Sequence, residues 1–160
     1  MATTAAHEPR ATAEGVRVVE LIPTSGAVVR VSGHTAALPR MFGDAFAATA
    51  RAIAASRGRM DGPPFARYIA FGHRVQAEVG FPFVGRLVED GHVYRTELPG
   101  GRAVTATHAG PYETIGTTWD AARAWIDEQG LEVAGPAWES YLTGPEDPGP
   151  PVTEIYWPIR

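Results

Sequence analysis

A repeat of two short blocks constrains the fold of this chain more than any other feature of its sequence. The first block, 62–68 (GPPFARY), matches 135–141 (GPAWESY), and the second, 78–83 (EVGFPF), matches 154–159 (EIYWPI). Because the blocks recur in the same order, they predict two halves of similar structure. A half of this size with a single helix is too small to cover its own sheet. We therefore expect the two halves to pack about a pseudo-two-fold axis, with a ligand cleft between them.

Each half shows the same order of elements: a β-hairpin, a helix and two more strands. Runs of β-branched and aromatic residues predict the strands, and Gly/Pro clusters predict the turns. In the first half the hairpin joins 16–22 to 27–31 through 23–26, the helix covers 38–56, and the strands cover 65–71 and 75–84. In the second half, strands 93–98 and 103–108 flank 99–101, the helix covers 112–129, and strands 138–143 and 152–159 follow. Residues 58–62 are expected to form a turn. The predicted fold class is α+β, a duplicated β-α-β-β repeat with antiparallel sheets, two main helices and a central ligand cleft.

In both predicted helices, mainly apolar residues recur every three or four positions and so share one face. These faces consist of Phe42, Ala45, Phe46, Thr49 and Ile53 in the first helix and of Tyr112, Ile115, Trp119, Ala122 and Ile126 in the second. Pro39 and Pro111 suit the first turns, and Gly58 and Gly130 suit the positions just past the ends. We expect Trp119 to belong to the core.

Composition and charge exclude several classes of function. The chain has 160 residues, no cysteine and a formal net charge of −4. Disulfides and Cys-ligated metals are therefore excluded, and no basic run indicates a nucleic-acid partner. No stretch approaches the ~20 apolar residues of a membrane span, and the start of the chain lacks a signal-peptide pattern. The histidines lack metal-ligand spacing, and no nucleotide-binding motif occurs. We expect a cytoplasmic monomer or dimer without metal or cofactor. Residues 1–14 are expected to be a disordered tail, followed by one domain made of repeats 15–84 and 85–160.

Three blocks of the second half carry a family resemblance: 108–113 (HAGPYE), 135–143 (GPAWESYLT) and 154–159 (EIYWPI), with Trp119 on the helix between the first two. With these blocks, the chain resembles the GyrI-like small-molecule-binding superfamily, which includes the effector-binding domains of multidrug-responsive transcription regulators. The resemblance extends over 15–160 and is weaker in the first half. It implies a duplicated β-α-β-β fold, a ligand cleft between the repeats, and a buried glutamate that faces cationic aromatic ligands. That glutamate maps onto Glu139. With no DNA-binding head in the sequence, the chain resembles the stand-alone members.

Glu139 is the main candidate site residue. Strand alternation places Trp138 on one face and Glu139 with Tyr141 on the other. A carboxylate among aromatic rings would pair with a ligand that carries delocalised positive charge, and the rings would stack on that ligand. Two alternatives remain open: Glu139 is exposed on its strand, or it forms an internal ion pair with an arginine such as Arg67.

Tyrosines and other aromatic residues supply the remaining candidates. Tyr112, at the helix start, and Tyr141 are expected to donate hydrogen bonds to a ligand, with ordinary packing as the alternative. The further ligand-binding candidates are Tyr68, Phe65, Phe81, Trp138, Trp157 and Arg67. For the aromatic residues core packing is the alternative, and for Arg67 a position on the surface. Because Ala66 corresponds to Glu139 in the first block, the cleft is expected to be asymmetric.

Three functions are compatible with these residues. The favoured hypothesis is a protein that binds hydrophobic, aromatic, cationic drug-like molecules, for sequestration or sensing and for protection against xenobiotics or antibiotics. The second is suggested by the resemblance, since some stand-alone members are similar to hydrolases of cyclopropane-bearing natural products. Glu139 would then act as general base and Tyr112 or Tyr141 as proton donor. The third is a protein that binds a macromolecule such as gyrase through its surface, for which the net charge of −4 is a weak argument.

Overall fold

The computed structural model describes residues 15–89 and 91–160, so the predicted tail, 1–14, lies outside the described residues. These described residues contain two α-helices, α1 (Leu38–Ala55) and α2 (Ile115–Glu128), each preceded by a 3-10 turn, η1 (Thr35–Ala37) and η2 (Tyr112–Thr114). The strands are β1 (Arg17–Leu21), β2 (Thr24–Gly33), β3 (Arg59–Met60), β4 (Phe65–Ala70), β5 (Val75–Val84), β6 (Val93–Leu98), β7 (Gly101–Ala109), β8 (Trp138–Tyr141) and β9 (Val152–Pro158).

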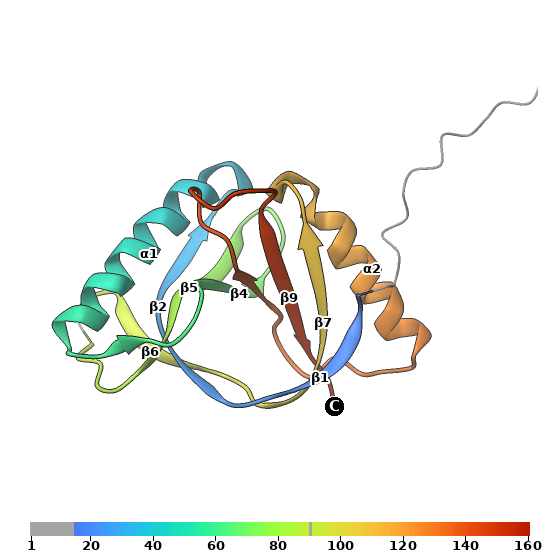
Figure 1. The fold of residues 1–160 in the computed structure, drawn as a ribbon, viewed down its shortest axis with the longest axis horizontal. Coiled ribbons are helices and arrows are strands. Elements are labelled where there is room, and N and C mark those ends of the chain that lie inside the picture. The colour runs from blue at the N-terminus through green and yellow to red at the C-terminus, as the bar shows by residue number, and fades with distance from the viewer. Residues whose placement is uncertain (1–14, 90) are drawn as a thin grey trace, which may run out of the picture.

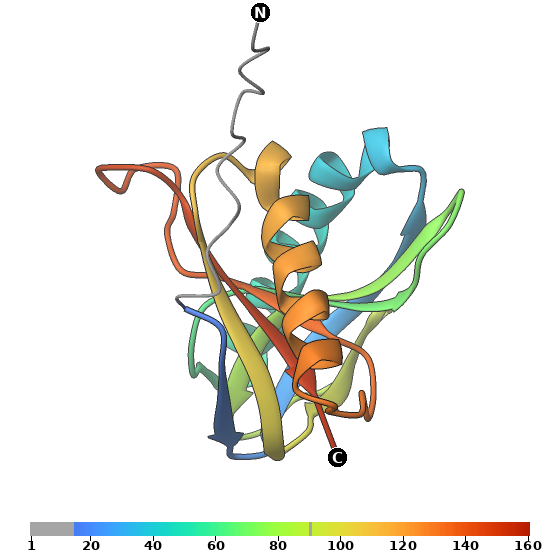
Figure 2. The same cartoon turned by 90° about the vertical axis from the view of Figure 1, so that its right-hand side faces the viewer.

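The strands form one curled antiparallel sheet in the order β1-β7-β9-β8-β4-β5-β2-β6, with β3 paired to β5 (Figure 1). The helix α1 packs on β2 and β5, and α2 packs on β7. The predicted α+β class, with antiparallel strands and two main helices, is confirmed. Figure 2 shows the turn between β4 and β5 and the loop between β8 and β9 extending in opposite directions, with both helices between them. No helix among the described residues is long and apolar enough to cross a membrane.

Both helices form where apolar residues recur every three or four positions, because this spacing gives each helix one face to bury against the sheet. In α1 the buried residues are Phe42, Ala45, Thr49 and Ile53, and in α2 they are Ile115, Thr118, Ala122 and Ile126. The second helix begins three residues later than predicted, because 112–114 form the tighter turn η2. Tyr112 therefore stands outside α2, at the junction between the sheet and the helix.

The two predicted hairpins at the start of each half are wrong. β1 pairs with β7, while β2 pairs with β5 and β6. Only Ile22 and Pro23 separate β1 from β2, and a two-residue hairpin turn needs residues that adopt positive φ. Proline fixes φ near −65° and favours an extended residue before it, so the chain continues from β1 across to the other side of the sheet.

The edge strands are thus exchanged, since β1 pairs with β7 and β6 pairs with β2. The connection from β1 to β2 and the connection from β6 to β7 come into close contact. A side chain at Gly100, between β6 and β7, would lie 2.4 Å from Cδ of Pro23, between β1 and β2. Glycine is therefore required at Gly100 for the two connections to pass each other. A further small departure from prediction is β3, which pairs Arg59 and Met60 with the end of β5 where a turn was expected.

The sheet face opposite the helices is also packed. It buries Val28, Phe65, Leu98 and Trp138, and Tyr156 stacks on Trp138 with ring centroids 5.5 Å apart. Alternate residues of one strand point to opposite faces, so β4 and β8 each contribute side chains to both. This alternation decides which of the predicted site residues can meet.

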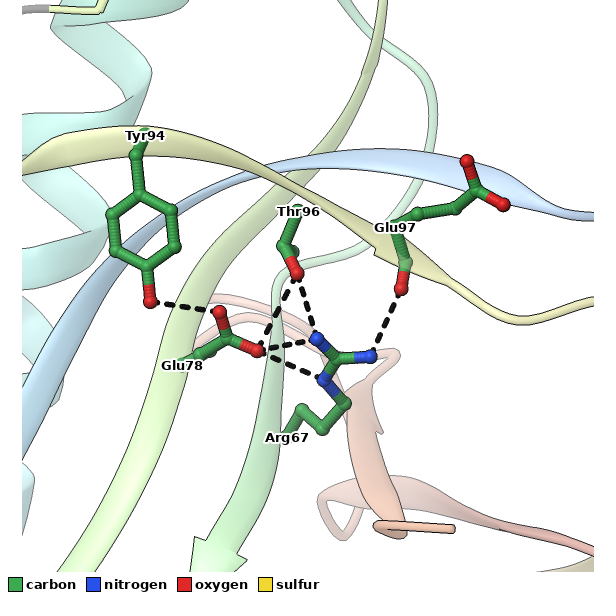
Figure 3. Close-up of polar contacts among 5 residues, drawn as sticks. All are labelled: Arg67, Glu78, Tyr94, Thr96 and Glu97. Carbon is green, nitrogen blue, oxygen red and sulfur yellow. Dashed lines mark hydrogen bonds and ion pairs between the residues drawn. The ribbon is translucent and has the colours of Figure 1, made fainter. Parts of the chain in front are cut away.

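Polar side chains connect strands on this second face (Figure 3). Arg67 of β4 forms an ion pair with Glu78 of β5 and donates to Thr96 Oγ1 at 2.7 Å and to the carbonyl of Glu97 at 2.9 Å, both on β6. Tyr94 donates to the other oxygen of Glu78 at 2.7 Å. Burial disfavours the charge of Glu78, but the hydrogen bonds from Arg67 and Tyr94 outweigh burial and lower the pKa of its carboxyl. The cluster ties β4, β5 and β6 together across the curl of the sheet.

Candidate functional site

Glu139 lies within β8, directly opposite Ala66 of β4, on the face covered by the helices. Only 2% of its surface is exposed. The small side chain of Ala66 leaves room for larger side chains to close over the carboxylate. A carboxylate at this depth is costly unless hydrogen-bond donors surround it.

Four uncharged donors surround the carboxylate of Glu139. The Oε2 atom accepts hydrogen bonds from the hydroxyls of Tyr141 at 2.7 Å, Tyr112 at 2.8 Å and Tyr68 at 2.9 Å. The Oε1 atom accepts one from Nε1 of Trp119 at 2.8 Å. An ionised carboxylate can only accept hydrogen bonds, and every one of these partners can donate. The arrangement is therefore suited to a negative charge.

The same donors form part of an aromatic enclosure. Tyr68 stacks on Phe71 with centroids 4.9 Å apart and meets Trp119 edge to face at 6.2 Å. Tyr141 contacts the ring of Phe46 at 6.0 Å and that of Tyr112 at 6.1 Å. The rings direct their polar groups at the carboxylate, and a buried negative charge in aromatic surroundings suits an aromatic cation by charge and by stacking.

The three phenols remain protonated at neutral pH. Burial, together with the charge of Glu139, raises the pKa of Tyr112 to about 12 and also raises that of Tyr68. Burial also raises the pKa of Tyr141 well above its ordinary value, and the neighbouring Tyr68 and Glu139 add to the effect. At neutral pH these residues act as hydrogen-bond donors rather than as bases.

Within 15–89 and 91–160, no ion pair involves Glu139. Arg67, the cation considered as its partner, instead pairs with Glu78 on the other face of the sheet. No cluster of His, Asp and Glu that could hold a metal ion occurs in the same described ranges. The charge of Glu139 thus faces only neutral side chains.

Comparison with known families assigns the fold. A family model, the GyrI-like small molecule binding domain, matches residues 26–160. The chain belongs to the GyrI-like family. No curated protein sequence matches this GyrI-like domain at a significant level.

Solved structures with the same fold are distant in sequence from this GyrI-like domain. The C-terminal domain of EcmrR is 16% identical with a TM-score of 0.79, covering 91% of this chain and 96% of that one. The protein SAV2435, bound to tetraphenylphosphonium, is 10% identical with a TM-score of 0.66, covering 91% and 93%. A hydrolase from Listeria innocua is 14% identical with a TM-score of 0.59, covering 91% and 92%. At these identities the likeness shows the fold alone.

The structure of the GyrI-like domain separates three predicted ligand-binding residues from Glu139. Phe65, Arg67 and Trp138 point to the opposite sheet face, because each is adjacent in its strand to a residue of the Glu139 face. Any ligand beside Glu139 is therefore screened from them by the sheet itself.

The other predicted residues lie on the helix-covered face. Tyr68, Tyr112 and Tyr141 contact Glu139 directly. Phe81 and Trp157 do not contact Glu139 directly but pack against rings of the aromatic enclosure. Phe81 lies at 5.8 Å from Phe46, and Trp157 lies at 5.3 Å from Trp119, measured between ring centroids.

Sequence reasoning missed Trp119 as a site residue of the GyrI-like domain and assigned it to the core. Its spacing of seven residues from Tyr112 could not reveal this role, because the same spacing fits a core position equally well. Phe46 and Phe71 were also missed as parts of the enclosure. Phe46 resembles any other apolar residue of an amphipathic helix, and Phe71 lies just past the end of β4.

A large concavity of the GyrI-like domain lies away from Glu139. It measures about 840 Å³ and is lined by small apolar residues of α1 and by the edge of β2, with charges of both signs at its rim. A smaller one of about 310 Å³ lies on the opposite sheet face, beside Trp138 and Tyr156. Neither contains Glu139, whose immediate surroundings are filled by aromatic rings. The cavity volumes and the buried carboxylate therefore indicate different places. We take the surroundings of Glu139 as the candidate site, because burying a carboxylate costs free energy that packing alone does not explain.

Proposed function

We propose that this GyrI-like domain binds hydrophobic, aromatic, cationic small molecules, with the carboxylate of Glu139 as the counter-charge. The observation that carries the proposal is the burial of Glu139 among four donors that are all uncharged. Such donors lessen the cost of burying a negative charge without neutralising it. A cationic ligand would supply the missing positive charge.

The aromatic residues around Glu139 suit the rest of such a ligand. The rings of Tyr68, Tyr141 and Trp119 would present faces to a planar or multi-ring cation, and a desolvated cation–π contact is worth up to about 2 kcal/mol. A structural neighbour, SAV2435, is bound to tetraphenylphosphonium, an aromatic cation. This neighbour supports the ligand class by analogy of fold.

Fluorescence polarisation of a rhodamine-type dye tests the proposal directly. Glu139→Gln removes the charge while keeping the size of the side chain, and should weaken dye binding at least tenfold, which corresponds to about 1.4 kcal/mol. The matched control is Glu97→Gln, which removes one charge from an exposed side chain on β6. Equal affinities for the wild type and Glu139→Gln would remove Glu139 from the binding site, and no binding of any aromatic cation would overturn the proposed function.

A hydrolytic function is the second candidate, and one observation favours it. The hydroxyls of Tyr112 and Tyr141 both lie within 2.8 Å of the same oxygen of Glu139, so a general base and two hydrogen-bond donors share one site. Glu139 would activate a water for attack on a strained electrophilic ring, and a phenol would stabilise the oxyanion that forms. Mass spectrometry after incubation with a cyclopropane-bearing alkylator separates the two functions. Turnover that Glu139→Gln abolishes supports the hydrolase, and unchanged compound after excess incubation contradicts it.

A further inference from the structure

The hydroxyl groups around Glu139 make more contacts than they have hydrogens. Three phenol oxygens lie within hydrogen-bond distance of Oε2, and the hydroxyls of Tyr68 and Tyr112 also lie 2.9 Å from each other. These are four oxygen–oxygen contacts. Each phenol carries one hydrogen and an ionised carboxylate carries none, so three hydrogens serve the four contacts. One of the four contacts therefore brings two oxygens together without a hydrogen between them.

Removing Tyr112 balances this network. A carboxylate oxygen has about two lone-pair positions. If Tyr112 withdraws, the hydroxyls of Tyr68 and Tyr141 each direct their single hydrogen to Oε2 and fill both positions. The contact between Tyr68 and Tyr112 disappears at the same time. Withdrawal of Tyr68 would balance the network in the same way, whereas withdrawal of Tyr141 would leave two hydrogens for three contacts. Burial and backbone position must therefore decide between Tyr112 and Tyr68.

Burial and backbone position both single out Tyr112. It is 44% exposed, whereas Tyr68 is 7% exposed and belongs to the core cluster beneath α1. Tyr68 and Tyr141 are fixed in β4 and β8 by strand pairing, and Tyr112 stands on the short turn η2 outside the sheet. Its ring contacts the ring of Tyr141, while Tyr68 contacts the rings of Phe42, Phe71 and Trp119. Of the three, Tyr112 loses least packing by moving.

The backbone below Tyr112 is held in place, so only its side chain needs to move. The carbonyl of Pro111 lies 2.9 Å from Nε2 of His108 and accepts a hydrogen bond from Thr114 Oγ1, also at 2.9 Å. Nδ1 of His108 in turn lies 2.8 Å from Thr118 Oγ1 of α2. Rotation of the Tyr112 side chain would carry its hydroxyl into water and open one side of the carboxylate.

We propose that Tyr112 is the group that a bound ligand replaces, and that its hydroxyl competes with the ligand for Glu139. This inference rests on the proposed function, because it concerns the same carboxylate. With Tyr112 displaced, Tyr68 and Tyr141 occupy both positions of Oε2, so the incoming group meets a carboxylate oxygen whose acceptor positions are already used. The vacated space therefore suits a cation that donates no hydrogen bond, such as a quaternary or phosphonium ion.

Single hydroxyl deletions test this proposal, with tetramethylrhodamine methyl ester and tetraphenylphosphonium as probes, since neither cation has an N–H to donate. Tyr112→Phe should bind both at least as tightly as the wild type and up to about tenfold tighter, since a net hydrogen bond of roughly 0.5–1.5 kcal/mol no longer competes. Tyr141→Phe, the matched control on β8, should bind them more weakly, because it removes a donor that stays on Glu139. Weaker binding by both variants would overturn the proposal.

Thermal unfolding without ligand gives an independent reading. Tyr112→Phe should shift the unfolding midpoint by less than Tyr141→Phe does, because its hydroxyl is the surplus donor. An equal or larger loss for Tyr112→Phe would overturn the inference even if no probe binds. Absence of probe binding to the wild type, together with the expected order of unfolding midpoints, would count against the proposed function and support the surplus hydroxyl.

Discussion

Ala66 and Glu139 face each other across the pairing of β4 with β8, at the middle of the sheet order. Ala66 is fully buried and Glu139 nearly so. The methyl group on one side and the carboxylate on the other make the centre of this face asymmetric. A single negative charge therefore occupies the point where the two halves of the sheet meet.

A second acid at this position should be poorly tolerated. Ala66→Asp would place two carboxylates on cross-strand neighbours, whose Cβ atoms lie about 5 Å apart. We expect the free energy of unfolding to fall by about 3–5 kcal/mol, the cost of leaving a buried charge uncompensated. Urea unfolding measures the loss, and Ala66→Ser, which adds a polar atom without charge, should lose much less. A fully stable Ala66→Asp variant would show that the site is wetter than the structure indicates.

The Arg67–Glu78 pair should affect stability and leave ligand binding intact. Arg67→Met leaves the carboxylate of Glu78 buried with Tyr94 and Thr96 as partners, which should cost about 3–5 kcal/mol of unfolding free energy. The double variant Arg67→Met/Glu78→Met should recover a large part of this loss. Dye affinity of the folded double variant should equal that of the wild type, because the pair lies on the sheet face away from Glu139. Weakened binding would indicate that the two faces are coupled.

Alkaline pH should destabilise the protein before its tyrosines ionise individually. Burial raises the pKa of Tyr112 and of Tyr156 to about 12, while the same groups in the unfolded chain ionise near pH 10. A raised folded-state pKa means that the neutral form stabilises the fold. This contribution is complete below about pH 10 and is lost as the pH rises toward 12.

Unfolding midpoints measured across this pH range, with ultraviolet absorbance of phenolate recorded in parallel, check this prediction. Phenolate should appear together with unfolding, since the pKa values of Tyr68 and Tyr141 are raised as well. Ordinary titration of all the tyrosines near pH 10 in a protein that stays folded would contradict it.

Two glycines offer a matched pair of substitutions with opposite signs. A Cβ at Gly80 in β5 would lie 1.8 Å from the carbonyl oxygen of Ala27 in β2, so Gly80→Ala must push the two strands apart. We expect a loss of about 3 kcal/mol or more. A Cβ at Gly116 in α2 meets nothing within 4 Å, and Gly116→Ala should stabilise by about 0.5–1 kcal/mol. Chemical denaturation of both variants provides the comparison. A neutral Gly80→Ala would mean that β2 and β5 are less closely packed than described.

The periodic features of the sequence predicted the helices and the strands near Glu139 well. The spacing of Phe42, Thr49 and Ile53 depends only on the local helical repeat, and the structure buries all three. Strand alternation likewise placed Glu139 and Tyr141 on one face. Such patterns are local, so a single sequence contains enough information to read them.

Strand pairing and the composition of the site could not be derived in the same way. The partner of β1 is β7, far along the chain, and although Pro23 disfavours a hairpin with β2, no local signal identifies β7 as the partner instead. Trp119 fits a core position and a site position equally well, because periodicity gives the face of a residue but not what lies opposite. The contact of its indole with Glu139 depends on how α2, which packs on β7, is placed relative to β8.

The exchange of edge strands has a consequence for how the chain is made. β1 leaves the ribosome early, but its partner β7 is synthesised only after β2, α1, β4, β5 and β6. In the same way, β2, β3, β4 and β5 are synthesised before β6, the edge strand that pairs with β2. Strand pairings between segments far apart in the sequence form slowly, and a strand that is still unpaired is prone to aggregate. Neither half of the gene encodes a sheet with both edges in place, so the two halves must be inherited, expressed and folded as one unit.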